Sequence, residues 1–124
     1  MSSAFRIVIA LVGVFFTVQG LGWLVAPASA AASLGMPLLD GVGRSTQIGD
    51  FATFFLAAGA SILFGVRAGN ERVLYFPALM LGGAAGMRTL AWVLHGADFA
   101  ALFIGVELAM CALLLAAVRS PRPV

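Results

Sequence analysis

Three charged residues stand inside otherwise apolar stretches and are the first candidates for chemistry: Asp50, Arg88 and Glu107. The planar guanidinium of an arginine suits carboxylates, so Arg88 is expected to pair with Glu107, with Asp50 approaching from the outer side. Two carboxyl groups beside one arginine leave one negative charge in excess. Either one carboxyl stays protonated, or Arg44 folds over the site to pair with it. Such a set suits acid/base catalysis, and it equally makes an ordinary structural ion pair.

Four apolar segments must position these residues: about 7–26, 48–66, 73–94 and 99–118. Each has about the 20 residues that a helix needs to cross the hydrocarbon core of a membrane. The chain has 124 residues, of which 62% are hydrophobic and 10% are charged, whereas a soluble domain averages about 25% charged residues. Because backbone polar groups in lipid must be bonded internally, the segments are predicted to be helices.

The predicted fold is therefore all-α: one integral membrane domain over residues 1–124, built as a four-helix up-down bundle. A mostly apolar connection, about residues 27–45, is expected to form an interfacial segment with a short helix near 28–34. Arg6 and the following apolar run resemble a secretory signal. The apolar core is nearer twenty residues than the usual seven to fifteen, so we expect a retained first helix.

The arginines predict the orientation. They precede the first helix, flank the second turn and follow the fourth helix: Arg6, Arg67, Arg72, Arg119 and Arg122. The first connection has only Arg44, and the third has none. By the positive-inside rule, the chain is predicted to be a multi-pass membrane protein with both termini and the second turn cytoplasmic.

Four polar residues then fall at similar depths. At 1.5 Å per residue, they lie within about 12 Å of the outer ends of their helices: Gln19, Asp50, Arg88 and Glu107. We predict that they form one buried cluster. Further ligand-binding candidates near its mouth are Arg44, Thr46, Gln47, Thr53, Trp92 and His95.

The function expected from this cluster is the binding of a lipophilic small molecule or lipid. If the site is catalytic, Asp50, Arg88 and Glu107 would perform cofactor-free acid/base chemistry, such as epoxide opening or hydrolysis, or isomerisation of an isoprenoid- or sterol-like substrate. Two alternatives stay open. The chain could be an accessory or assembly subunit of a larger membrane complex, or a proton-coupled small transporter using Glu107.

A row of small residues in the third segment, Gly82, Gly83 and Gly86, predicts close helix packing or a homo-oligomer seam. Other functions are disfavoured by composition. Cys111 and His95 are the only cysteine and histidine, so we expect no metal site and no cofactor. No basic run suggests nucleic-acid binding, and no phosphate-binding loop or Ser-His-acid set is present.

The chain also resembles the bacterial DUF4345 and DoxX-like families. The resemblance rests on a Gly-Leu-Gly-Trp end to the first helix at Trp23, a following Pro, Leu-Gly-Met-Pro, and Gly-Arg leading into the second helix. It implies a small four-helix membrane protein, and DoxX-type proteins are linked to redox or quinone-associated membrane systems. The absence of a Cys-x-x-Cys pair argues against a thiol-redox role here, and the resemblance assigns no catalytic residue.

Overall fold

Every regular element in residues 1–120, the part of the chain that the structure describes, is helical. The computed structural model contains five α-helices and one short 3-10 helix: α1 (Ser3–Val25), α2 (Pro27–Ser33), α3 (Gly41–Gly65), η1 (Glu71–Leu74), α4 (Tyr75–His95) and α5 (Ala101–Arg119). The all-α prediction is confirmed for these residues. Arg122, one of the arginines used to predict orientation, lies outside them.

Four of the helices, α1, α3, η1 with α4, and α5, are long and apolar enough to cross a membrane. Little of their surface is buried inside the protein: in the most apolar window of α5, only 17% of the residues are buried. Apolar side chains that the protein does not bury need another apolar environment. The helices are therefore those of a multi-pass membrane protein.

The connection between α1 and α3 is more helical than the sequence predicts. The expected short helix near 28–34 is confirmed as α2, which begins with Pro27 at a position where proline fits a helix. The second long helix begins at Gly41 rather than near Ile48 and so includes the last residues of the expected interfacial segment; the boundary of that segment at about 45 stays a prediction. Apolarity marks where lipid begins, whereas a helix can continue through polar residues beyond it.

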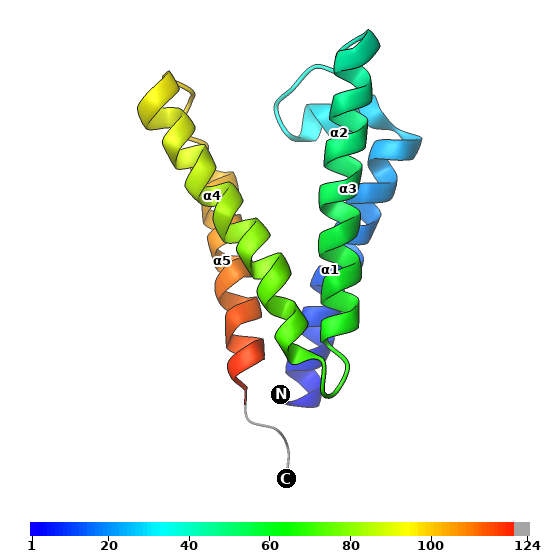
Figure 1. Ribbon diagram of the computed structural model, residues 1–124, viewed down its shortest axis with the longest axis vertical. Helices are drawn as coiled ribbons and strands as arrows, with labels where there is room; N and C mark the ends of the chain where they lie inside the picture. The colour runs from blue at the N-terminus through cyan, green and yellow to red at the C-terminus, as the bar shows by residue number, and fades with distance from the viewer. Residues whose placement is uncertain (121–124) are drawn as a thin grey trace.

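The helices form two arms that join at one end and diverge at the other (Figure 1). One arm consists of α1 packed on α3, with α2 across their far end, and the other consists of α4 packed on α5. The turn from α3 through η1 to α4 links the arms at the joined end. Along the chain, α1 leads away from the joined end, α3 returns to it, α4 leads away and α5 returns (Figure 1).

The distribution of buried side chains explains the divergence. At the joined end, one core holds side chains from both arms, among them Ile9, Ile62, Leu81 and Leu114. The core at the other end contains Trp23 and residues of α2 and α3, and so belongs to one arm alone. Since the second arm contributes nothing to that core, the arms separate above the shared one.

Glycines bring α1 and α3 into close contact. A Cβ added at Gly20 would lie 2.6 Å from Leu56 Cγ and 2.9 Å from the backbone nitrogen of the same residue. A Cβ added at Gly59 would lie 2.7 Å from the backbone nitrogen of Thr17. These contacts involve backbone atoms, so only residues without a side chain allow this spacing.

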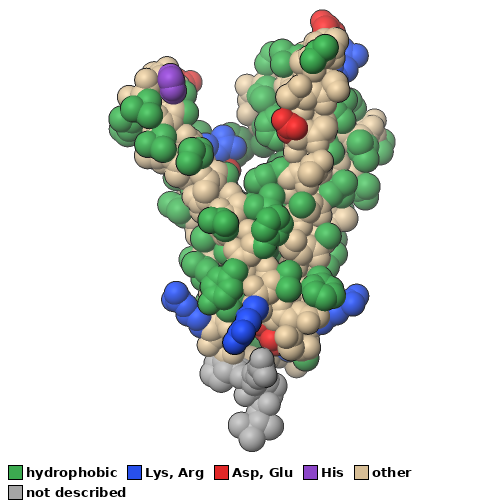
Figure 2. All heavy atoms as spheres, in the orientation of Figure 1, with side chains coloured by type: hydrophobic (Ala, Val, Ile, Leu, Met, Phe, Trp, Pro, Cys, Tyr) green, Lys and Arg blue, Asp and Glu red, His purple; other side chains and the backbone are tan. Residues whose placement is uncertain are grey.

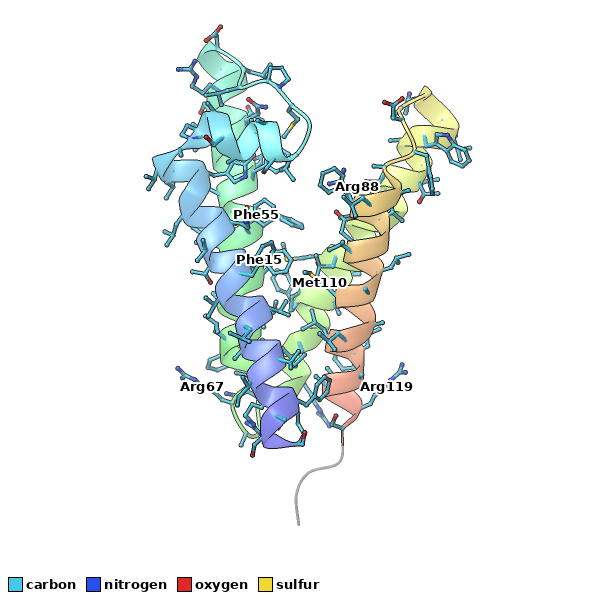
Figure 3. The ribbon with its side chains drawn as sticks, turned by 180° about the vertical axis from the view of Figure 1, so that it is seen from behind. Phe15, Phe55, Arg67, Arg88, Met110 and Arg119 are labelled. Carbon is cyan, nitrogen blue, oxygen red and sulfur yellow. The ribbon has the colours of Figure 1, made fainter. Side chains whose placement is uncertain are left out.

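The arginines gather at the joined end. Arg6 donates a hydrogen bond to the carbonyl of Val66, in the link between the arms. Arg67 and Arg119 extend outward there (Figure 3), and the space-filling view shows the basic side chains concentrated at this end (Figure 2). The far ends of the arms carry Arg44 and His95. The basic side chains are thus distributed unevenly along the long axis of the molecule, with most of them at the joined end.

Candidate functional site

An ion pair links α4 and α5 partway along their arm. Arg88 Nε donates a hydrogen bond to Glu107 Oε1 over 2.9 Å. The Arg88 guanidinium also lies over the ring of Phe103, with Cζ 4.7 Å from the centroid. Phe103 and Glu107 are four residues apart on α5 and so share a face. The predicted pairing of Arg88 with Glu107 is confirmed, and both of its partners come from one helix.

The pair leaves hydrogen-bonding capacity unused. The side chain of Glu107 is only 14% exposed, and its Oε2 atom is buried without a hydrogen-bond partner in residues 1–120. Across the same residues, the two terminal nitrogens of Arg88 form no hydrogen bond, and this side chain is 33% exposed. A buried carboxylate oxygen normally has a partner, so a donor supplied from outside the protein would satisfy it.

A cavity of about 550 Å³ lies between the arms and contains this pair in its wall. Its volume is in the range of about 300–1,000 Å³ typical of small-molecule sites. Six phenylalanines dominate the lining: Phe15, Phe16, Phe51, Phe54, Phe55 and Phe103. Figure 3 shows Phe15 and Phe55 projecting from one arm toward the other, where Met110 and Arg88 lie, and Figure 2 shows the hollow between the arms.

The opposite wall carries the other two members of the predicted cluster. Gln19 of α1 and Asp50 of α3 both line the cavity. Neither forms a hydrogen bond or ion pair with any residue of the described chain, and no ion pair joins Asp50 to Arg88. The prediction of one buried cluster is therefore wrong. Their predicted place in the outer halves of the helices did bring all four groups to one cavity, but the arms diverge, and Asp50 is exposed rather than buried.

Arg44 does not fold over the site. Its Nη2 donates to Asp40 Oδ1 over 2.8 Å, and its Nε donates to the carbonyl of Leu39 over 2.8 Å. Both partners lie just before α3, and Asp40 is four residues before Arg44. Of the two alternatives for the excess carboxyl group, pairing with Arg44 is not observed, because Arg44 has a local partner within one helical turn.

Gln47 does not line the cavity, and its side chain instead bonds the backbone of the segment before α3. Its Oε1 accepts from the Leu39 backbone nitrogen over 2.7 Å, and its Nε2 donates to the Pro37 carbonyl over 3.0 Å. The side chain is 7% exposed. Buried between α3 and the segment before it, Gln47 satisfies backbone groups of residues 37–39 that have no helix to bond them.

The remaining mouth candidates lie outside the lining. Thr46 and Thr53 are exposed on α3. Trp92 packs on Phe99, with ring centroids 4.9 Å apart, and so ties the end of α4 to the turn before α5. His95 is exposed in the last turn of α4, beside Gly96 in the left-handed conformation that ends the helix. The structure thus brings none of these four side chains to the pair.

The phenylalanines are the part of the site that sequence reasoning left undecided or missed. The pairs Phe15–Phe16 and Phe54–Phe55 are consistent with packing, with a lipid-facing surface or with the lining of an apolar pocket, and Phe51 and Phe103 were not considered. One signal was present in the sequence: Phe54 follows Asp50 by one helical turn, and Phe103 precedes Glu107 by one turn. Aromatic residues one turn from intramembrane charges mark the side of a helix that faces those charges.

No group of three or more potential metal ligands occurs in residues 1–120. The chain matches no family model, no curated protein and no solved structure. The cavity is therefore the feature that indicates a function. It is a largely apolar, aromatic space whose wall contains the Arg88–Glu107 pair. Glu107 Oε2 and the Asp50 carboxyl group have no partner in the described residues.

Proposed function

We propose that this protein is a small integral membrane protein that binds a lipophilic small molecule in the cavity between its two arms. The observation that carries the proposal is the cavity of about 550 Å³, lined by six phenylalanine rings, with the Arg88–Glu107 pair in one wall. An apolar site with a few convergent polar groups is the usual form of a small-molecule site.

The proposed setting is the bacterial cytoplasmic (inner) membrane. Arginines at the joined end favour a cytoplasmic location for that end and for both termini. The four long helices would then cross the bilayer alternately, as an up-down arrangement that is open on the outer side. The cavity between the diverging arms would be entered from the outer half of the bilayer.

The hydrogen-bonding atoms without a partner support a ligand with a polar group at this wall. Most of the ligand would contact phenyl rings and replace lipid or water there. Its polar group would reach Glu107 Oε2, which lacks a partner in the described residues, or the terminal nitrogens of Arg88. Satisfying a buried carboxylate oxygen contributes on the order of 1–3 kcal/mol to binding.

The same oxygen favours a second, narrower proposal. Glu107 Oε2 could accept a proton from one carbon of a bound substrate and return it to another carbon, while Arg88 holds the other oxygen; this shifts a double bond without a cofactor. A role for Asp50 as a second acid or base, and thus for hydrolysis or epoxide opening, requires a substrate that contacts both walls of the cavity.

The two other roles receive less support. A proton-coupled transporter needs a carboxyl group that is easily protonated, and Glu107 is held by Arg88 at 2.9 Å. An accessory subunit or a homo-oligomer would need an open surface at the row of glycines. Gly82 does not offer one, because it packs against Cys111 of the same chain: a Cβ added at Gly82 would lie 3.1 Å from Cys111 Sγ. No described atom would lie within 4 Å of a Cβ at Gly83 or Gly86, so a seam there stays a prediction.

Photoaffinity labelling tests the binding proposal. A long-chain alcohol carrying a diazirine is equilibrated with the protein in nanodiscs and photolysed, and the labelled residues are mapped by mass spectrometry. We expect labels on residues of the cavity wall, suppressed by an excess of the unmodified alcohol. Labels spread evenly over the lipid-facing surfaces, without competition, would contradict the proposal.

A matched pair of variants adds specificity. Ala84 lines the cavity, whereas Ala109 on the neighbouring helix is exposed and outside the lining. Ala84→Phe fills the cavity and should abolish the competed labelling. Ala109→Phe adds the same side chain to the lipid-facing surface and should leave the labelling unchanged. Equal effects of the two substitutions would count against the cavity as the site.

A further inference from the structure

The charge of the cavity lining is unbalanced. Three charged groups line it, Asp50, Arg88 and Glu107. Arg88 and Glu107 neutralise each other through the contact between Nε and Oε1 at 2.9 Å. Asp50 has no hydrogen bond or ion pair anywhere in residues 1–120, and Arg44, the other arginine at that end, is held by Asp40. The lining therefore has two carboxyl groups for one arginine, and Asp50 is the carboxyl group without a partner in residues 1–120.

The position of Asp50 favours a partner for its carboxylate. It is the tenth residue of α3 (Gly41–Gly65), and the apolar part of this helix begins near Ile48. In a helix that crosses a membrane, the carboxylate therefore lies near the outer end of the apolar span. Carboxylates within such a span are normally paired, or face a water-filled space. Asp50 lines a space that is mostly apolar.

The rings around the cavity suit a cation. Phe51 and Phe54 follow Asp50 on α3 by one and four residues, and Phe15, Phe16 and Phe55 complete the aromatic wall of that arm. The face of a phenyl ring attracts positive charge, and an aromatic enclosure is a common means of binding organic cations that have shed their water. The structure contains an example in the same cavity, where Arg88 lies over the ring of Phe103.

We infer that the ligand of this cavity is a lipophilic organic cation, whose positive charge lies near the Asp50 carboxylate and against the phenyl rings of α1 and α3. This inference rests on the proposed function and specifies the charge class of the ligand. An anionic amphiphile would meet the Asp50 charge with only an already paired arginine to offset it. A neutral one would leave that charge uncompensated.

Three probes of one shape and different charge test the inference. Tetraphenylphosphonium is a cation, tetraphenylsilane is neutral and tetraphenylborate is an anion. Each tritiated probe is titrated against the full-length protein in nanodiscs by scintillation proximity, with empty nanodiscs subtracted. We expect the cation to bind at least tenfold more tightly than the neutral probe and the anion not to bind. Equal binding of the cation and the neutral probe would overturn the inference and leave the proposed function intact.

Substitution of the aspartate isolates its contribution. Asp50→Asn keeps the shape of the side chain and should weaken the binding of the cation about tenfold, without weakening that of the neutral probe. Asp98→Asn removes the same charge from an exposed residue at the same end of the molecule, outside the lining, and should have no effect. An equal loss in both variants would assign the preference to general surface charge and overturn the inference. Binding of none of the three probes above empty nanodiscs would contradict the proposed function as well.

Discussion

Arg88 and Glu107 meet through a single hydrogen bond of 2.9 Å, although they stand on different helices and nineteen residues apart in the chain. The bond lies beyond the core shared by both arms, where α4 and α5 are held mainly by each other. Arg88 additionally covers the ring of Phe103. The pair thus fixes the arm that forms one wall of the cavity, and it presents an unsatisfied carboxylate oxygen to that cavity.

Breaking this pair should destabilise the protein, and the effects of substituting Arg88 and Glu107 should be less than additive. Arg88→Ala and Glu107→Ala each leave one charge without its partner, and we expect each to lower the free energy of unfolding by about 1–3 kcal/mol. The double variant should lose less than the sum, with a coupling energy of about 1 kcal/mol. Unfolding in mixed detergent micelles measures all four proteins. Strictly additive losses would show that the contact contributes nothing to folding.

Two glycines of α1 should respond oppositely to alanine. Gly20→Ala places a Cβ against the backbone of Leu56 and should cost about 1–3 kcal/mol. Gly22 has no atom within 4 Å of such a Cβ, and alanine is the better helix former, so Gly22→Ala should be neutral or stabilising by up to about 1 kcal/mol. Thermal unfolding of the two variants is the measurement. Equal effects would mean that α1 and α3 are not packed through Gly20.

Gln47 should hold residues 36–40 in place. Gln47→Leu removes the acceptor for the Leu39 nitrogen and the donor to the Pro37 carbonyl. Hydrogen exchange in that segment should become at least tenfold faster, because the two backbone groups lose their partners. Thr46→Ala, one residue earlier and exposed, serves as the control and should leave exchange unchanged. Protection that survives in Gln47→Leu would show that other contacts hold the segment.

The orientation can be read from cysteine accessibility. In a Cys111→Ala background, a cysteine is placed either at Ala68, in the turn at the joined end, or at Ala97, in the turn at the diverging end; both positions are exposed. A membrane-impermeant maleimide should label Ala97→Cys in intact spheroplasts and Ala68→Cys only after the membrane is opened. The reverse pattern would place the mouth of the cavity on the cytoplasmic side.

The sequence predicted the parts of the structure that depend on local composition. Continuous apolar runs indicated four long helices, and proline with small residues indicated α2, because both signals act within a few residues. Depth along the helices also placed Gln19, Asp50, Arg88 and Glu107 at one cavity. Depth, together with the fit of a guanidinium group to a carboxylate, correctly indicated that Arg88 would pair with Glu107.

What the sequence could not predict is the lateral spacing of the helices. A bundle that closes evenly and two arms that diverge have the same apolar runs, so Asp50 was expected at the ion pair and instead lies on the opposite wall. The number of hydrogen-bonding partners close in the sequence was also underestimated: Arg44 and Gln47 bond to groups of residues 37–40 and do not reach the cavity. Both errors arose because packing, not composition, decides which polar groups meet.

The central claim is that the space between the arms receives a lipophilic molecule, and the ten phenylalanines of the chain allow a direct test. Six line the cavity, whereas Phe64 and Phe76 are about half exposed on the outer surface. The protein is labelled on its phenylalanine rings and placed in deuterated lipid with whichever tetraphenyl probe binds most tightly. Nuclear Overhauser effects between probe protons and ring protons are then recorded. We predict effects to the rings of the cavity and none to Phe64 or Phe76. Effects only to those outer rings, or equally to all ten, would contradict the claim.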